Sequence, residues 1–198
     1  GIISIHLSSK LSGTFKSASI ASEDQSLKSK IKVIDTGHVS MSSGLCVLEA
    51  AKQAKNGADM DTIIETVNSF ASRAHLVALL DTLEYLEKGG RIGKARSMLG
   101  SLLNIKPMIT IENGESKEFG KARTFKKGVA KLRDFCYQFD KLHSLSVVYS
   151  TDLDLAIEFS DSLSSLLEDS IPIIGRIGPV TGTHSGPGTL GVGLVPKI

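Results

Sequence analysis

Short apolar runs alternate with amphipathic segments along the first third of the chain. Residues 2–7 and 31–35 are rich in β-branched apolar side chains and predict two strands. From about Ser12 onward, and again over residues 42–56 and 59–74, apolar side chains recur every three or four positions, which predicts helices. Alternating strands and helices of this kind predict a parallel sheet with covering helices.

The rest of the chain mixes hairpin and helix patterns, which predicts a mixed sheet with helices. Residues 76–80 form an apolar strand run, after which Asp81 is placed to cap a short helix with Glu84 three residues on. The pair Asn113-Gly114 between two strand-like runs predicts a hairpin with a type I′ turn. The other expected elements are helices at 92–103, 125–139 and 156–166, and strands at 145–149 and 190–195, the last of which we expect to close the sheet.

These patterns together predict an α/β protein of two lobes, with residues 1–75 in the first and residues 76–198 in the second. The first lobe is expected to hold the parallel sheet, and the second the mixed sheet. Because a strand pattern starts at the first residue with no lead-in, we expect the first lobe to be incomplete, with its N-terminal part missing.

Composition and charge narrow the classes of function. The chain has 198 residues, of which 41% are hydrophobic and 22% charged, as in an ordinary globular protein. A net charge of +2 does not drive nucleic-acid binding without a local basic patch. Cys46 and Cys136 lie in separate helical patterns without a CxxC motif, so we expect both to be reduced, buried thiols of a cytoplasmic protein. No apolar run is long enough for a membrane span, and no stable membrane insertion is expected.

Two polar segments are candidates for binding a ligand. Residues 8–14 contain four hydroxyl side chains and a glycine where a strand leads into a helix, a setting that favours an anion. Plain N-capping explains single serines there equally well. Residues 178–193 contain six glycines and two prolines around His184, so we expect an irregular binding loop and no regular helix. His184 is placed to donate a hydrogen bond to an anion or to act as a base.

Basic side chains form two clusters, one around Gly89-Gly90 and one around the predicted hairpin. Such clusters are commonly solvated faces, although they also suit an acidic or phosphate-bearing partner. No aromatic residues are interleaved with them, which argues against single-stranded nucleic acid. The sequence contains no P-loop, GxGxxG, GxSxG or zinc-ligand spacing, so we expect neither a metal nor a cofactor.

Taken together, five sequence blocks resemble the DegV family. They occur in the family's order and span the chain. The blocks are Ser8-Ser9-Lys10-Leu11-Ser12-Gly13-Thr14-Phe15, Leu86-Glu87-Lys88-Gly89-Gly90-Arg91-Ile92, Leu99-Gly100-Ser101-Leu102-Leu103-Asn104-Ile105-Lys106-Pro107, Lys121-Ala122-Arg123-Thr124, and Gly178-Pro179 with Gly182 through Gly188. Family members begin with a strand that carries an Asp-Ser-Thr motif, and they later have a Thr-Ser-Gln-Pro motif whose threonine also meets the ligand's head group. Neither motif is present here.

The resemblance implies a two-lobed protein that binds a long-chain fatty acid between its lobes. It further implies a carrier, and no enzyme, that presents the acid to a fatty acid kinase, which makes the acyl phosphate for phospholipid synthesis in bacteria. By resemblance, Ser12, Ser9 and His184 hold the carboxylate, while Arg91 and Arg123 dock the kinase. No cofactor beyond the bound fatty acid and no nucleic acid is implied.

Two alternatives come from the residues alone. The first is a small-molecule hydrolase or phosphotransferase that uses His184 as its base. It needs a nucleophile or metal beside His184, and the sequence offers only serines without an acidic partner. The second is a DNA-binding regulator that uses the basic clusters, for which binding should weaken steeply with salt.

Overall fold

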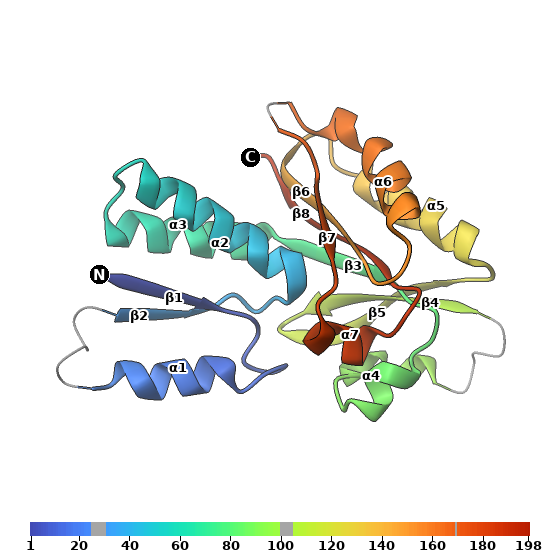
Figure 1. Cartoon of the computed structure of the whole chain (residues 1–198), viewed down its shortest axis with the longest axis horizontal. Coiled ribbons are helices and arrows are strands. Elements are labelled where there is room, and N and C mark those ends of the chain that lie inside the picture. The colour runs from blue at the N-terminus through green and yellow to red at the C-terminus, as the bar shows by residue number, and fades with distance from the viewer. Residues whose placement is uncertain (25–30, 100–104, 169) are drawn as a thin grey trace.

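The computed structural model describes residues 1–24, 31–99, 105–168 and 170–198, and this part of the chain forms two sheets. The smaller sheet pairs β1 (Ile2–His6) with β2 (Ile31–Asp35) in parallel, with Ile2 opposite Ile31. Helix α1 (Thr14–Ser22) lies on one side of this sheet, and α2 (Ser40–Lys55) and α3 (Met60–Arg73) lie on the other (Figure 1). The predicted parallel sheet with covering helices is confirmed.

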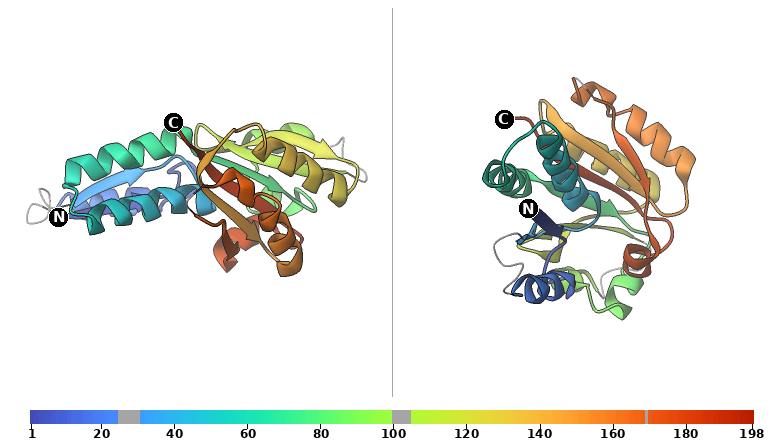
Figure 2. Two further views of the ribbon diagram at one scale, coloured as in Figure 1. Left: turned by 90° about the horizontal axis from the view of Figure 1, so that it is seen from above. Right: turned by 60° about the vertical axis from the view of Figure 1, so that its left-hand side comes forward.

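The strands of the larger sheet are, in spatial order among the described residues, β5 (Glu115–Ala122), β4 (Lys106–Glu112), β3 (His75–Leu79), β8 (Leu190–Pro196), β6 (Leu142–Tyr149) and β7 (Ile173–Arg176). Only β6 and β7 pair in parallel and the other neighbours are antiparallel, so the predicted mixed sheet is also confirmed. Helices α5 (Phe125–Cys136) and α6 (Leu153–Asp161) lie together beside this sheet, away from α4 (Glu84–Lys88) and α7 (Pro179–Ser185) (Figures 1 and 2). Short 3₁₀ helices cover Gly93–Met98 (η1) and Ser164–Leu166 (η2).

Alternation along β3 separates a packed core from an open face. Val77 and Leu79 are fully buried in the main hydrophobic core, together with residues of α5 and α6. Leu76, Ala78 and Leu80 point to the opposite side, because successive side chains of a strand face opposite sides of its sheet. That second face forms part of a cavity wall and is called the open face below. The start of α2 and a hydrophobic cluster that includes Leu86 and Ile92 pack against other parts of this face.

The start of α2 packs directly on the middle of β8. A β-carbon built on Gly193 would lie 2.9 Å from the backbone nitrogen of Ser42, so no side chain fits at this position. The two sheets are also joined by polar contacts. The hydroxyl of Ser8, after β1, donates to the carbonyl of Gly114 in the β4–β5 turn at 2.7 Å, and Arg73 Nη1 donates to the carbonyl of Pro196 at 2.6 Å.

Local turn chemistry is predicted well in one place and poorly in another. Asn113 and Gly114 have φ values of 52° and 79°, so the predicted type I′ turn is confirmed. The predicted cap of Asp81 on the following helix is wrong. The Asp81 carboxylate pairs with Lys106, and the hydroxyl of Thr82 accepts from the Glu84 N–H at 3.2 Å.

Two longer-range predictions are also wrong or incomplete. Residues 190–195 do not close the sheet, because β8 lies in its interior between β3 and β6. The helix expected over 92–103 is a short 3₁₀ helix at Gly93–Met98, and the predicted part from 100 to 103 lies outside the described residues. The division between residues 75 and 76 stays a prediction, and it falls where β3 begins.

Candidate functional site

A cavity of about 560 Å³ lies between the serine turn, the start of α2, the open face of the larger sheet and α7. This volume is within the range of small-molecule sites, about 300–1,000 Å³. Its sheet wall is apolar and includes Leu76, Ile109 and Val148. Ser40 and Ser43 line it from α2, and Ser40 has a positive φ of 57°, a backbone conformation that non-glycine residues adopt rarely.

The predicted serine turn supplies one side of this cavity. The backbone N–H groups of Leu11 and Ser12 both donate to the carbonyl of Ser8, at 3.0 and 3.1 Å, and so form a tight turn after β1. Ser12 and Thr14 line the cavity, whereas Ser9 does not. The Ser9 N–H instead donates to Asp35 at 3.1 Å, on the exposed side of the turn. The turn therefore brings Ser12 into the site and leaves Ser9 outside its lining.

His184 lies on a helix, contrary to the loop predicted from the glycines. Helix α7 runs from Pro179 to Ser185, and Gly186 follows it with a φ of 75°. A proline is tolerated at the first helical position because the N–H that it lacks has no partner in the helix there. Only Gly182 of the six glycines falls inside the helix, so the others bound or follow it. The helix orients His184 and Ser185 towards the cavity, which both line.

The imidazole of His184 packs against the end of α4. A β-carbon built on Gly89 would lie only 2.1 Å from His184 Nδ1, so the ring rests directly on the glycine backbone. Nδ1 of His184 and Oγ of Ser185 are both buried without a hydrogen-bond partner among the described residues. A buried polar atom left without a partner is costly, and a polar ligand in the cavity is a natural partner for such atoms. Ser185 was not predicted from the sequence, because nothing in the sequence distinguishes its hydroxyl from that of a surface serine.

Arg91 joins the serine turn to the His184 side of the cavity. Its Nε donates to the carbonyl of Leu11 at 3.2 Å and its Nη1 to the carbonyl of Gly89 at 2.9 Å. Leu11 precedes Ser12, and Gly89 contacts His184, so Ser12, Arg91 and His184 are brought to one region of the cavity. The family resemblance implies that Arg91 docks a kinase, which stays a prediction, and the structure places this exposed residue in the cavity lining.

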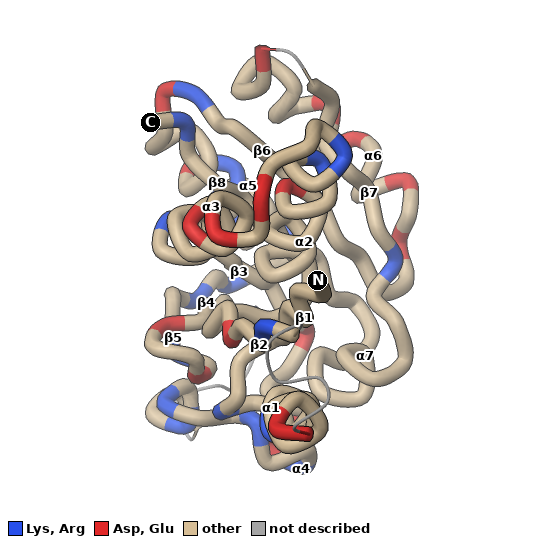
Figure 3. The backbone as a smooth tube through the Cα atoms, turned by 90° about the vertical axis from the view of Figure 1, so that its left-hand side faces the viewer, with Lys and Arg blue, Asp and Glu red and all other residues tan. Residues whose placement is uncertain are grey.

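Arg123 lies outside this cavity. It borders a separate hollow of about 540 Å³ that is also lined by Lys106 and Thr124. Together with Lys121, Lys127 and Lys131 it borders a further hollow beside the first. Figure 3 shows how Lys and Arg residues are distributed along the chain, including those near α4 and below β5. The two arginines predicted to act together therefore face different cavities.

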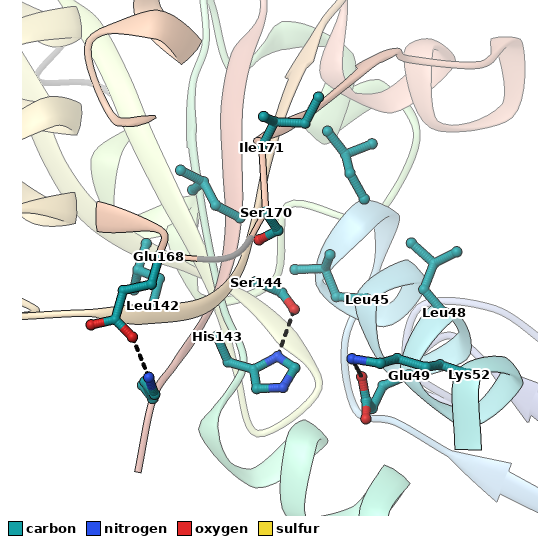
Figure 4. A pocket seen from close by; sticks show the side chains of 13 residues that line it. Leu45, Leu48, Glu49, Lys52, Leu142, His143, Ser144, Glu168, Ser170 and Ile171 are labelled. Carbon is teal, nitrogen blue, oxygen red and sulfur yellow. Dashed lines mark hydrogen bonds and ion pairs between the residues drawn. The ribbon is translucent and has the colours of Figure 1, made fainter. Parts of the chain in front are cut away.

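A hollow of about 300 Å³ between α2 and β6 differs in character from the central cavity (Figure 4). Lys52 approaches Glu49 at 4.0 Å, Lys197 pairs with Glu168, and His143 Nδ1 is 2.9 Å from Ser144 Oγ. Each lysine of this hollow is thus already beside a carboxylate, which makes it a poorer site for an anionic ligand.

Several titratable groups outside the cavity are shifted by burial. Burial lowers the pKa of His38, whose Nε2 lies 2.9 Å from the carbonyl of Ala71. Burial together with the nearby His38 lowers the pKa of His75. Cys46 and Cys136 are free and buried, and burial raises the pKa of their thiols to about 11 and about 12. The predicted reduced cysteines are confirmed as unpaired, and their burial leaves little reactive thiolate at neutral pH.

Two kinds of site are not found in the described part of the chain. No cluster of three or more histidine, cysteine or acidic side chains is arranged to hold a metal ion. No helix among these residues is long and apolar enough to cross a membrane.

Comparison with known proteins gives a consistent family assignment. The profile of the DegV family, whose members are described as uncharacterised, matches residues 1–197. A DegV domain-containing protein of Streptomyces coelicolor is 34% identical over 197 residues, which are 97% of this chain and 69% of that protein.

Solved structures of the same family share the fold. A DegV family protein from Thermus thermophilus, described by its fatty acid binding, superposes with a TM-score of 0.88 at 30% identity, over 98% of this chain and 70% of that one. DegV from Bacillus subtilis, described as a fatty acid binding protein, gives a TM-score of 0.82 at 30% identity, over 98% and 70% of the two chains. From its sequence and its two-sheet architecture, the chain belongs to the DegV family.

Proposed function

We propose that this protein binds a long-chain fatty acid in the central cavity and holds its carboxylate with Ser12 and His184. The observation that carries the proposal is the asymmetry of the cavity. One wall is the apolar face of the larger sheet, while hydroxyl, imidazole and guanidinium groups meet where the serine turn, α4 and α7 converge. A single-chain amphiphile matches this arrangement, with its tail on the sheet and its head at the polar end.

The energetics favour a fatty acid over a fully polar ligand. Burying an alkyl chain contributes about 0.8 kcal/mol per CH₂ group, so the apolar wall provides most of the gross attraction. Burying a carboxylate without donors would cost several kcal/mol. Donors at one end of the cavity offset that cost, and Ser12 and His184 are two such donors. Ser9 has no place in this clamp, because its side chain does not line the cavity.

The solved relatives support the same assignment. The structures from Thermus thermophilus and Bacillus subtilis are both described as binding fatty acids, and each aligns with nearly the whole of this chain. Use of His184 as a catalytic base has less support, because no hydrogen bond joins His184 to a hydroxyl or carboxylate among the described residues.

We further propose that the protein is a carrier that presents the bound acid to a fatty acid kinase, which forms the acyl phosphate. Arg123 and the neighbouring Lys121, Lys127 and Lys131 lie away from the cavity around a separate hollow, where they are available to an acidic partner surface. Charge complementarity of this kind mainly speeds association and selects the partner.

Mass spectrometry of organic extracts from the purified protein, followed by titration with a fluorescent fatty acid, tests the binding proposal. We expect a co-purified fatty acid, and we expect His184→Ala and Ser12→Ala to weaken binding about tenfold or more, since a hydrogen bond to a charged group contributes about 1.5–3 kcal/mol. Ser9→Ala serves as the matched control, because it removes the same hydroxyl group from a residue that does not line the cavity. Absence of any extracted acid, together with no binding of an added one, would rule the function out.

A further inference from the structure

Arg91 is the one charged side chain, among the described residues, that lines the central cavity. The other described lining residues are apolar or neutral, apart from His184, and none of them is acidic. Arg91 forms no ion pair with any described carboxylate. The cavity therefore holds one permanent positive charge with no negative charge of the protein to balance it.

The guanidinium of Arg91 is held in place by the protein before any ligand binds. Two of its N–H groups donate to the backbone carbonyls of Leu11, in the serine turn, and Gly89, at the end of α4. The remaining N–H groups have no acceptor among the described residues. A planar guanidinium fixed in this way loses little further freedom when it binds an anion, which favours recognition of a carboxylate or phosphate.

The neighbours of Arg91 also fix where that anion would lie. Leu11, which accepts from Nε, precedes Ser12, and Gly89, which accepts from Nη1, contacts the ring of His184. An anion beside Arg91 is therefore close to both groups assigned to the head group. A neutral head would leave the positive charge without a counter-ion, and a cationic head would be repelled by it.

We propose that Arg91 is the counter-ion of the ligand head group and restricts the cavity to single-chain amphiphiles that carry a negative charge, phosphate monoesters as well as carboxylates. This inference rests on the proposed lipid-binding function, and it gives Arg91 a role in the site in place of the docking role implied by family resemblance. A phosphate monoester carries more negative charge than a carboxylate and offers three acceptor oxygens. Arg91 is an exposed residue, so solvent screens the attraction and the effect is moderate.

Three ligands that each contain a sixteen-carbon chain separate charge recognition from structural support. Palmitate, hexadecyl phosphate and hexadecanol are each used to displace a fluorescent fatty acid from the whole chain at constant ionic strength. We expect the wild-type protein to bind both anions more tightly than the alcohol. We expect Arg91→Gln to weaken palmitate about tenfold, hexadecyl phosphate by at least as much, and hexadecanol hardly at all. Arg91→Lys, which keeps the charge, should restore part of the loss.

Arg96→Gln is the matched control, because Arg96 is exposed in the neighbouring η1 and does not line the cavity. It should leave all three affinities unchanged. Equal weakening of all three ligands in Arg91→Gln would show that Arg91 only supports the structure, and unchanged affinities would also overturn the inference. In both of those cases the wild-type protein still binds palmitate, so the proposed function stands. A wild-type protein that binds none of the three ligands would overturn the function as well.

Discussion

Gly89 offers a direct test of the position of His184, because Gly89→Ala changes that position without touching the histidine. Gly89 ends α4 with φ −75° and ψ −5°, a conformation that alanine adopts without strain. The added methyl group would lie 2.1 Å from His184 Nδ1 and 2.8 Å from Cε1. Carbon atoms pack at about 3.5–4.0 Å, so the imidazole must move by more than about 1 Å.

The expected result is a loss of binding with little loss of stability. If the imidazole donates to the ligand's carboxylate, a displacement of this size removes a hydrogen bond worth about 1.5–3 kcal/mol, which is roughly a 10- to 100-fold rise in Kd. Replacing glycine by alanine where the backbone allows it stabilises a protein by about 0.4–1 kcal/mol through the unfolded chain, and this gain offsets part of the local crowding. The binding defect should therefore exceed any change in the free energy of unfolding.

Displacement of a fluorescent fatty acid measures the first quantity, and chemical denaturation measures the second. Gly120→Ala is the control, because no atom lies within 4 Å of the β-carbon that it would add. Unchanged affinity in Gly89→Ala would refute the role given to His184. A large fall in stability, matched by the fall in affinity, would instead assign the defect to misfolding.

Two further predictions concern docking and pH. Arg123→Ala should leave fatty acid affinity unchanged and should slow acyl phosphate formation by an added fatty acid kinase. Equal rates of acyl phosphate formation with the variant and the wild type would contradict the docking role. The free energy of unfolding should decrease as pH drops below 6.5, the ordinary pKa of histidine. Burial lowers the pKa of His38 and His75 in the folded protein, so below this pH the unfolded chain takes up protons that the folded protein does not. His38→Gln should lessen this loss in denaturation curves measured across the pH range, and an unaltered pH profile would show that His38 does not cause it.

The elements that depend on local periodicity were predictable from the sequence. Helix α3 is an example, because its apolar stripe and its Asp59 cap, which accepts from the Thr62 N–H at 2.8 Å, are both local features. The hairpin turn at Asn113-Gly114 is another, since its positive φ values are encoded by two adjacent residues. These features need no knowledge of the tertiary structure.

Other features depend on contacts between distant segments and were missed for that reason. The glycines around His184 suggested a loop, yet α7 forms because Pro179 fits its first position and most of the glycines fall outside it. The interior position of β8 depends on partners more than 40 residues away in sequence, among them Val77 opposite Val192 and Val147 on the other side. Arg91 could be recognised as a basic residue, but its place in the cavity lining depends on the fold, which also brings it to Leu11, 80 residues away in sequence.

The absence of a side chain at Gly193 affects the width of the central cavity. The start of α2 rests on the strand backbone there, with the Ser42 nitrogen 2.9 Å from where a β-carbon would be. The same helix contributes Ser43, Gly44 and Val47 to the cavity wall. Any larger residue at position 193 would push α2 away from the sheet and widen the space between them. If the cavity holds a lipid as proposed, the width available to that lipid is therefore set in part by Gly193, in the middle of β8, which does not line the cavity.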